Sequence, residues 1–203
     1  MFKKLASEAL GLSDIGKIIA LGDYNKVDSD DYIFHEDNEQ IFFLIKSKKD
    51  EYCFTNRALI HVDGASAVSS KRVLKRYEYS HYTFRHVLLE TAGTIDLDAE
   101  IKFQLGEEYF SIDVDKQQIE QLKDLYKALF EIAHQQYLNM VSLDDARKSL
   151  ELATSAVGRL SSNATPSTEF EKMTQFAFQY IESAKGTYQR SDFTEVFQKF
   201  INN

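Results

Sequence analysis

Between residues 41 and 114, short apolar runs alternate with turn-forming residues. The clearest run spans residues 95–105, where apolar and polar positions strictly alternate, which is the period of a half-buried β-strand. Runs of this kind predict seven strands, at residues 41–46, 52–55, 58–62, 73–79, 83–90, 95–105 and 108–114. Strands this short and this closely spaced predict an antiparallel β-sandwich or open barrel rather than βαβ units.

The hydrophobic period changes to 3.6 residues beyond the last of these strands. This change predicts a helix from about residue 119 to Met140, with an apolar face that caps the open corner of the barrel. Ser142 is followed three residues later by Asp145, a pairing that is typical of a helix N-terminus. A second helix is therefore expected to begin there.

Apolar residues in the C-terminal part recur at alternating steps of three and four, first over residues 143–160 and again over residues 170–184. The chain's only proline, Pro166, lies between the two runs. Two such seams joined by a short loop predict a helical hairpin. The second seam is expected to stop at Gly186, and a last helix is expected from Ser191.

The N-terminal residues 2–21 also have helical spacing, broken at Gly11, and predict two short amphipathic helices or one kinked helix. The expected fold class is α+β. The expected order is an N-terminal helical segment (residues 1–29), an antiparallel sandwich or open barrel with a capping helix (30–140), and a helical hairpin (141–203).

Composition narrows the class of protein. A chain of 203 residues with 43% hydrophobic residues can bury a real core, so disorder is not expected. The net charge is −8, and residues 1–115 carry −7 of it, with 14 Lys and Arg against 21 Asp and Glu. An acidic body disfavours general nucleic-acid binding, which needs clustered cations, and loose attraction to anionic lipid surfaces.

The sequence also indicates a compartment. No apolar run approaches the ~20 residues needed to span a bilayer, and no signal peptide is expected at the N-terminus. The single cysteine, Cys53, excludes an internal disulfide and fits a reducing compartment. We therefore expect a cytoplasmic protein of bacterial type. Cys53 with His61 is a conceivable nucleophile and base, but its place beside an apolar run favours a buried, inert thiol.

Two segments resemble the bacterial pleckstrin-homology domain: residues 54–63, which read F-T-N-R-A-L-I-H-V-D, and residues 90–100, which read E-T-A-G-T-I-D-L-D-A-E. The resemblance covers residues ~30–130, and residues ~140–203 resemble the YvbH-like oligomerisation region that follows this domain in some members. The resemblance implies a pleckstrin-homology-like fold and ring-like homo-oligomers. Tyr79-Ser80-His81 departs from the family's usual Ile-Pro-Tyr turn.

Basic residues are the candidates for contact with an anion or a lipid headgroup. Strand alternation divides the dense cluster at residues 71–76 between two faces. A solvated strand edge and a contact with a partner or headgroup both stay open. The candidate residues are Lys46, Lys48, Lys49, Lys71, Arg72, Lys75 and Arg76. Asp96, Asp98 and Glu100 lack the glycine of a calcium loop and are expected on a solvated strand face, with a weak divalent site as the alternative.

The C-terminal part has more aromatic residues than a two-helix hairpin can bury alone. They are expected either to pack against the sandwich of the same chain or to lie between copies of the chain, and the resemblance favours the second. The residues expected at the interface are Leu150, Ala153, Val157, Leu160, Phe170, Met173, Ala177, Tyr180, Phe193, Phe197 and Phe200.

No phosphate-binding glycine loop, nucleophile elbow or metal-ligand spacing is found. The leading hypothesis is therefore a non-catalytic, homo-oligomeric scaffold or adaptor without a cofactor or metal. Its expected partner is another copy of itself, with a different protein as a further candidate and no nucleic acid. The alternative hypothesis is a membrane-peripheral module that binds anionic lipid headgroups through the basic residues.

Overall fold

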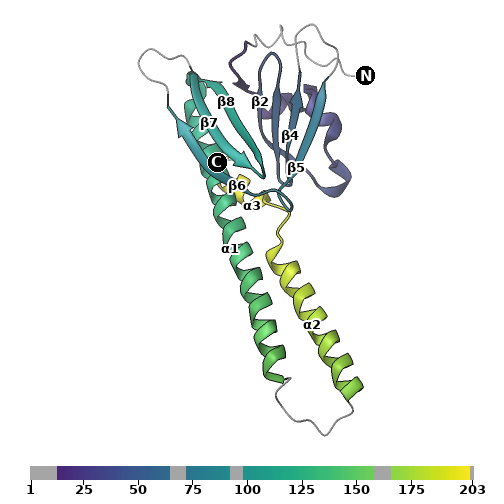
Figure 1. The fold of residues 1–203 in the computed structure, drawn as a ribbon. Helices are drawn as coiled ribbons and strands as arrows, with labels where there is room; N and C mark the ends of the chain where they lie inside the picture. The colour runs from purple at the N-terminus through teal and green to yellow at the C-terminus, as the bar shows by residue number, and fades with distance from the viewer. Residues whose placement is uncertain (1–12, 65–71, 92–97, 158–165, 202–203) are drawn as a thin grey trace. The chain divides into compact units, whose positions relative to one another are not determined.

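The structure is a computed structural model, and it describes residues 13–64, 72–91, 98–157 and 166–201. Two antiparallel sheets form its β-part (Figure 1). Strands of the first sheet follow the order β1-β2-β3-β4-β5, with bounds Lys17–Ile18, Ile41–Lys46, Glu51–Thr55, Ala58–Asp63 and Val73–Glu78. Those of the second follow the order β6-β7-β8, with bounds Phe84–Glu90, Asp98–Leu105 and Glu108–Asp115. All seven predicted strands are present among the described residues, with residues 95–97 of the sixth lying outside them, and this confirms the α+β class.

Alternation in β7 has the predicted consequence for burial. Ala99, Ile101, Phe103 and Leu105 face the core, while the polar residues between them stay half-exposed. β7 pairs with β8 without a break, and the two strands meet at a turn through Gly106. Gly106 has a φ of 64° and a Cβ there would lie 2.6 Å from the Tyr82 ring, so the turn requires glycine.

β2, β3 and β4 are buried on both faces. One face contributes Phe43, Ile45 and Phe54 to the core shared by the two sheets. The other face, which includes Leu44 and Cys53, is covered by the segment at residues 19–33. That segment contains the 3₁₀ helices η2 (Leu21–Lys26) and η3 (Asp28–Tyr32), and η4 (His35–Asp37) follows them. The continuous apolar character of these strands therefore reflects a second covering layer.

The helix expected around Ile15–Ile19 is not formed, and this prediction was wrong. These residues instead form β1, which pairs with β2, and Gly16 bridges to Val114 of β8. A Cβ at Gly16 would lie 2.8 Å from the carbonyl oxygen of Asp113, so the close approach requires glycine. Neighbouring isoleucines also suit a strand because β-branched side chains are stiff at χ1. Residues 2–12 of the expected helical segment lie outside the described residues.

Helix α1 (Ile119–Val157) follows the short 3₁₀ helix η5 (Lys116–Gln118). Its first half buries Leu122, Leu125 and Leu129 in the core shared by the two sheets, as the helical period predicted. The prediction that it ends at Met140 and that Ser142 caps a new helix was wrong. No glycine or proline occurs between residues 119 and 157, so no residue stops the helix and Ser142 lies inside it.

Helix α2 (Pro166–Tyr188) begins at the proline, which suits the first helical position, and it continues past Gly186 rather than stopping there. Helix α3 (Thr194–Phe200) ends the described chain. Contacts divide the chain into two compact units, one of residues 1–133 with 191–203 and one of residues 134–190. The last helix thus groups with the β-sheets rather than with the hairpin, and this division differs from the expected boundary at residue 140.

Candidate functional site

Lys46 and Arg72, two of the candidate anion-binding residues, are held in ion pairs within the chain. Lys46 is buried, and its ammonium pairs with the carboxylate of Glu51, which is 1% exposed. The same carboxylate accepts a hydrogen bond of 2.9 Å from the backbone N–H of Ser29. Arg72 pairs with the carboxylate of Asp28. These cations therefore join η3 to β2 and to the residue before β5, and their charges are paired within the chain.

The other candidate basic residues are scattered. Lys48, Lys49 and Lys75 are exposed, and the Lys49 ammonium lies 3.8 Å from the carboxylate of Asp14. Lys71 lies outside the described residues. Among the residues that the structure describes, the candidate cations do not converge on one pocket, so no geometry favours the alternative of a lipid-headgroup site.

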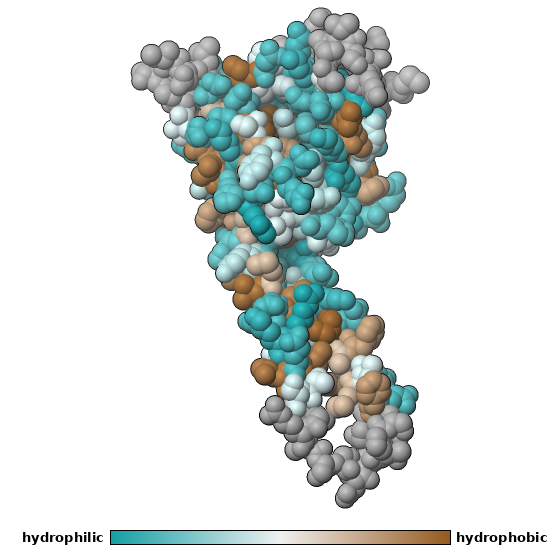
Figure 2. All heavy atoms as spheres, viewed as in Figure 1, coloured by the Kyte–Doolittle hydropathy of each residue, from teal (hydrophilic) through white to brown (hydrophobic). Residues whose placement is uncertain are grey.

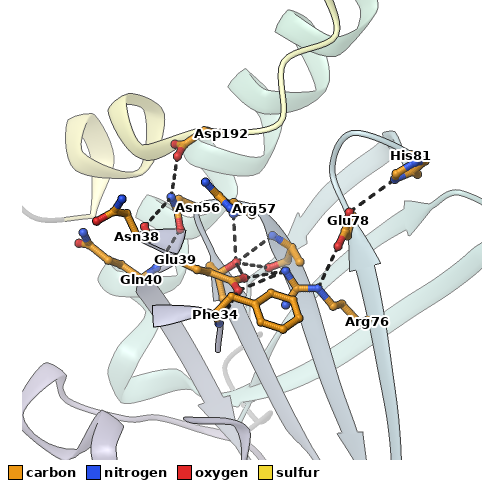
Figure 3. A network of polar contacts seen from close by, with 12 residues as sticks. Phe34, Asn38, Glu39, Gln40, Asn56, Arg57, Arg76, Glu78, His81 and Asp192 are labelled. Atoms are coloured by element: carbon orange, nitrogen blue, oxygen red, sulfur yellow. Dashed lines mark hydrogen bonds and ion pairs between the residues drawn. The ribbon is translucent and has the colours of Figure 1, made fainter. Parts of the chain in front are cut away.

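Arg76 belongs to a buried polar network around Glu39 (Figure 3). Its guanidinium donates to the Glu39 carboxylate at 3.1 Å and lies 4.6 Å from the centroid of the Phe34 ring. The Thr55 hydroxyl donates to the same carboxylate at 2.6 Å. A buried carboxylate needs such partners because an unpaired one is very costly. Glu39 thus fixes the chain before β2 to the end of β3 and to β5.

Asn56 extends this network to the C-terminal segment (Figure 3). Its side-chain oxygen accepts from the Gln40 N–H at 2.9 Å, and its side-chain NH₂ donates to Asp192 at 2.8 Å. Its backbone carbonyl accepts from the N–H of Phe193 at 2.9 Å. Burial raises the pKa of Asp192, but hydrogen bonds from Thr194 and Asn56 outweigh it, and the pKa lies below its ordinary value. We call these contacts of Asn56 with Asp192 and Phe193 the C-terminal latch.

Sequence reasoning did not identify the latch. Asn56 lies in the F-T-N segment that carries the family resemblance, and Asp192 stands two residues before Thr194, the first residue of α3. That spacing is typical of an Asx turn, in which an aspartate side chain accepts from the N–H two residues further on. It could have indicated a fixed helix start, but not its partner 136 residues away.

Two of the residues expected at the interface between copies lie inside the chain's own core. Phe193 and Phe197 are fully buried. The Phe197 ring stacks on Phe42 with a centroid distance of 5.3 Å, and the Phe193 ring meets Tyr79 edge-on at 5.9 Å. Phe200 is partly buried against the same core. The expectation that these rings lie between subunits is therefore corrected, because the sandwich of the same chain covers them.

The hairpin unit has a much smaller core of its own. Leu143 and Ala146 of α1 pack with Ala184 of α2, and Tyr188 is half-buried against them. Arg190 also donates to Gln135 at 3.2 Å. Leu150, Met173 and Ala177 are half-buried and Ala153 is exposed, while the Val157 side chain and Leu160 lie outside the described part. Few apolar groups thus hold these two helices together.

Large apolar side chains are instead exposed on the hairpin unit, where Figure 2 shows hydrophobic atoms interrupting the hydrophilic surface. Phe170, Phe176 and Phe178 on α2 are each more than 60% exposed. The exposed set in this unit is Tyr137, Leu138, Met140, Val141, Leu152, Phe170, Phe176, Phe178 and Tyr180. Exposed large apolar side chains gathered in one small unit mark an interaction surface, which makes the hairpin the candidate interaction site.

The remaining candidate chemistry is not assembled into a site. Cys53 is buried, as expected, and burial raises the pKa of its thiol well above the ordinary value, so it is a poor nucleophile. The described residues contain no cluster of His, Cys, Asp or Glu side chains that could hold a metal ion. None of the helices in the described ranges is long and apolar enough to cross a membrane.

Sheets with the strand orders above, capped by a long helix and followed by an exposed apolar hairpin, define a pleckstrin-homology-like protein with a helical extension. Comparison with known families agrees. The model of the bacterial pleckstrin-homology domain matches residues 9–133, and that of the YvbH-like oligomerisation region matches residues 144–203. The chain therefore belongs to the bacterial pleckstrin-homology domain family.

Two relatives match nearly the whole chain. "Uncharacterized protein YvbH" of Bacillus subtilis (strain 168) is 56% identical over 204 residues, which covers 100% of both chains. A pleckstrin-homology-domain-containing bacterial protein from Exiguobacterium sibiricum 255-15, solved by crystallography, is 48% identical. That match covers 93% of this chain and 100% of the other, with a TM-score of 0.86. The arrangement of the domain with its C-terminal extension is thus shared by both relatives.

Proposed function

We propose that the protein is a non-catalytic scaffold that associates with copies of itself through the hairpin of α1 and α2. The observation that carries this proposal is a contrast among the described residues of the unit 134–190. Its buried cluster comprises Leu143, Ala146 and Ala184, whereas nine large apolar side chains are exposed among those described. An isolated helix pair with so small a core is marginal in water.

The exposed surface is large enough for a stable interface. Aromatic and large aliphatic side chains bury about 150–250 Å² each when fully covered, so nine side chains that are half-exposed offer on the order of 900 Å². A stable protein–protein interface buries roughly 800 Å² on each partner. The match of this region to the YvbH-like oligomerisation region supports a second copy as the partner.

Within the interface predicted from the sequence, the residues on the hairpin stay part of the proposal: Leu150, Ala153, Val157, Leu160, Phe170, Met173, Ala177 and Tyr180. The phenylalanines of the last helix are not part of it. The sheets and α3 would then form the part of each copy that lies outside the interface.

The test is the mass of the full-length chain in solution, measured by light scattering after size exclusion. We expect a multiple of 23.4 kDa for the natural chain and a shift toward 23.4 kDa for the triple variant Phe170→Ser, Phe176→Ser, Phe178→Ser. The control is Phe130→Ser, which alters an exposed phenylalanine of α1 outside the hairpin unit. A natural chain that is monomeric at high concentration, or a triple variant that keeps its mass, contradicts the proposal.

A further inference from the structure

One flank of the hairpin carries a groove of about 460 Å³ between α1 and α2. Its floor contains Ala146 and Ala184, and its walls are small polar residues together with two tyrosines. The lining residues are Ser142, Asp145, Ala146, Ser149, Tyr180, Ser183, Ala184, Thr187 and Tyr188. Small side chains on facing helices leave room for a bulky side chain to enter from outside. A cavity of roughly 150 Å³ already holds benzene, so this groove has ample space for a phenyl ring.

The wall on α1 is one continuous stripe. Leu138, Ser142, Asp145, Ser149 and Leu152 follow steps of four, three, four and three, so they lie on one face of the helix. The two leucines at its ends are 47% and 73% exposed. The middle of the stripe is therefore shaped as a depression between two apolar ends.

The wall on α2 carries an aromatic projection beside the groove. Phe176 and Tyr180 are four residues apart and their rings stack with a centroid distance of 6.3 Å. Phe176, Ser183 and Thr187 fall on the same flank of α2, because residues seven and eleven apart align on a helix. Phe178 is displaced from Phe176 by about 200° around the axis. It therefore lies on the opposite flank, although it is equally exposed, at 68% against 63%.

We propose that the groove receives the Phe176 ring of a second copy, so that two hairpins join through this flank and not through the flank of Phe178. This inference rests on the proposed self-association and adds the surface that carries it. Phe176 and Ser183 are about 10 Å apart along α2 at ~1.5 Å per residue. A two-fold axis midway between these positions places each Phe176 beside the Ser183 of the other copy, so one contact is made twice.

A second copy suits the groove better than a small charged ligand does. Asp145 is the one charged residue among those lining the groove, so an ionic ligand would find no set of opposite charges there. An aromatic side chain fits the volume of the groove, and α2 of each copy presents one, Phe176, beside it. A complementary surface on each copy is what a symmetric dimer interface requires.

The experiment compares two matched variants of the full-length chain by sedimentation equilibrium. Phe176→Ala should weaken association by about 30-fold, the effect of truncating a buried aromatic anchor. Phe178→Ala, which removes an equally exposed ring from the other flank, should change it by less than about 3-fold. Both sites are exposed on a helix, so neither variant threatens the fold.

A second pair of variants tests the groove itself: one blocks it with a bulky side chain, and the other is a control. Ser149→Trp places a bulky ring in the groove wall and should weaken association as Phe176→Ala does. The control is Ser155→Trp, at an exposed position of α1 that lies about 120° around the helix axis from Ser149. If Phe178→Ala weakens association as much as Phe176→Ala, or if Ser149→Trp has no effect, the groove assignment is wrong while self-association stands. A natural chain that does not associate at all refutes the proposed function instead.

Discussion

Substitution of Phe197 by alanine distinguishes between two locations for this ring: the core of its own chain and an interface between copies. The Phe197 side chain is fully buried, stacked on Phe42 at 5.3 Å and tilted against Tyr79 at 6.4 Å. Truncating a buried phenylalanine costs about 3–5 kcal/mol, and the aromatic contacts add about 0.5–1.5 kcal/mol beyond area burial. Because Phe42 and Tyr79 are themselves held in the core, the cavity cannot collapse freely, so we expect a loss of about 4 kcal/mol.

The assay is thermal unfolding followed by circular dichroism, repeated at two protein concentrations. For a chain of this size, a loss of about 4 kcal/mol lowers the Tm by about 8–16 °C. The matched control is Phe178→Ala, an exposed ring whose loss should change stability by less than about 0.5 kcal/mol. If Phe197→Ala left stability intact and only lowered the mass of the assembly, Phe197 would lie between copies, and the burial of α3 within its own chain would be refuted.

Two further substitutions test the latch and the buried ion pair. The pKa of Asp192 is lower in the folded chain than its ordinary value, so its stabilising contribution is complete above pH ~4 and is lost as the pH falls below that value. Asp192→Asn should therefore destabilise the chain at neutral pH and differ less from the natural chain near pH ~3; an equal difference in urea unfolding at both pH values contradicts the latch. Lys46→Ala should lower the free energy of unfolding by about 3 kcal/mol, because it leaves the Glu51 carboxylate buried without its cation. The control Lys48→Ala, at an exposed lysine, should lower it by less than about 0.5 kcal/mol. Equal losses in the two variants would show that the Lys46 ion pair does not stabilise the fold.

The strands could be predicted from the sequence because the pattern of apolar and polar residues in each strand reflects which of its side chains are buried. Phe103 and its apolar neighbours in β7 alternate with polar residues whichever strands lie beside them. β1 was missed since two residues are too few for a period, and its identity depends on pairing with Ile45 of the distant β2. The continuation of α1 past Ser142 is hidden by the local cap signal of Ser142 with Asp145, although no residue that stops a helix occurs between residues 119 and 157.

The placement of the C-terminal aromatics shows a different limit. The number of rings indicated that some surface outside the hairpin must cover them, but composition does not say which surface. Phe193 enters the core because its N–H reaches the carbonyl of Asn56 and because Tyr79 offers an edge-on contact. Both partners lie more than 100 positions away, so periodicity along the chain could not identify them. Phe176 has the same residue type and the opposite environment.

Because Phe193 and Phe197 lie in the core and Phe176 is exposed on the hairpin, substitution and truncation of the C-terminal part have different effects. The chain leaves the sandwich unit after residue 133 and returns to it at residue 191, so the hairpin is an insertion and not a tail. Truncation at residue 140 would remove Phe193, Val196 and Phe197 from a core that they help to fill, and unfolding would then be mistaken for loss of assembly. Surface substitutions on the hairpin avoid this because they leave α3 in place. Self-association and folding are then measured separately, although any binding that favours the folded chain still raises its apparent stability with concentration.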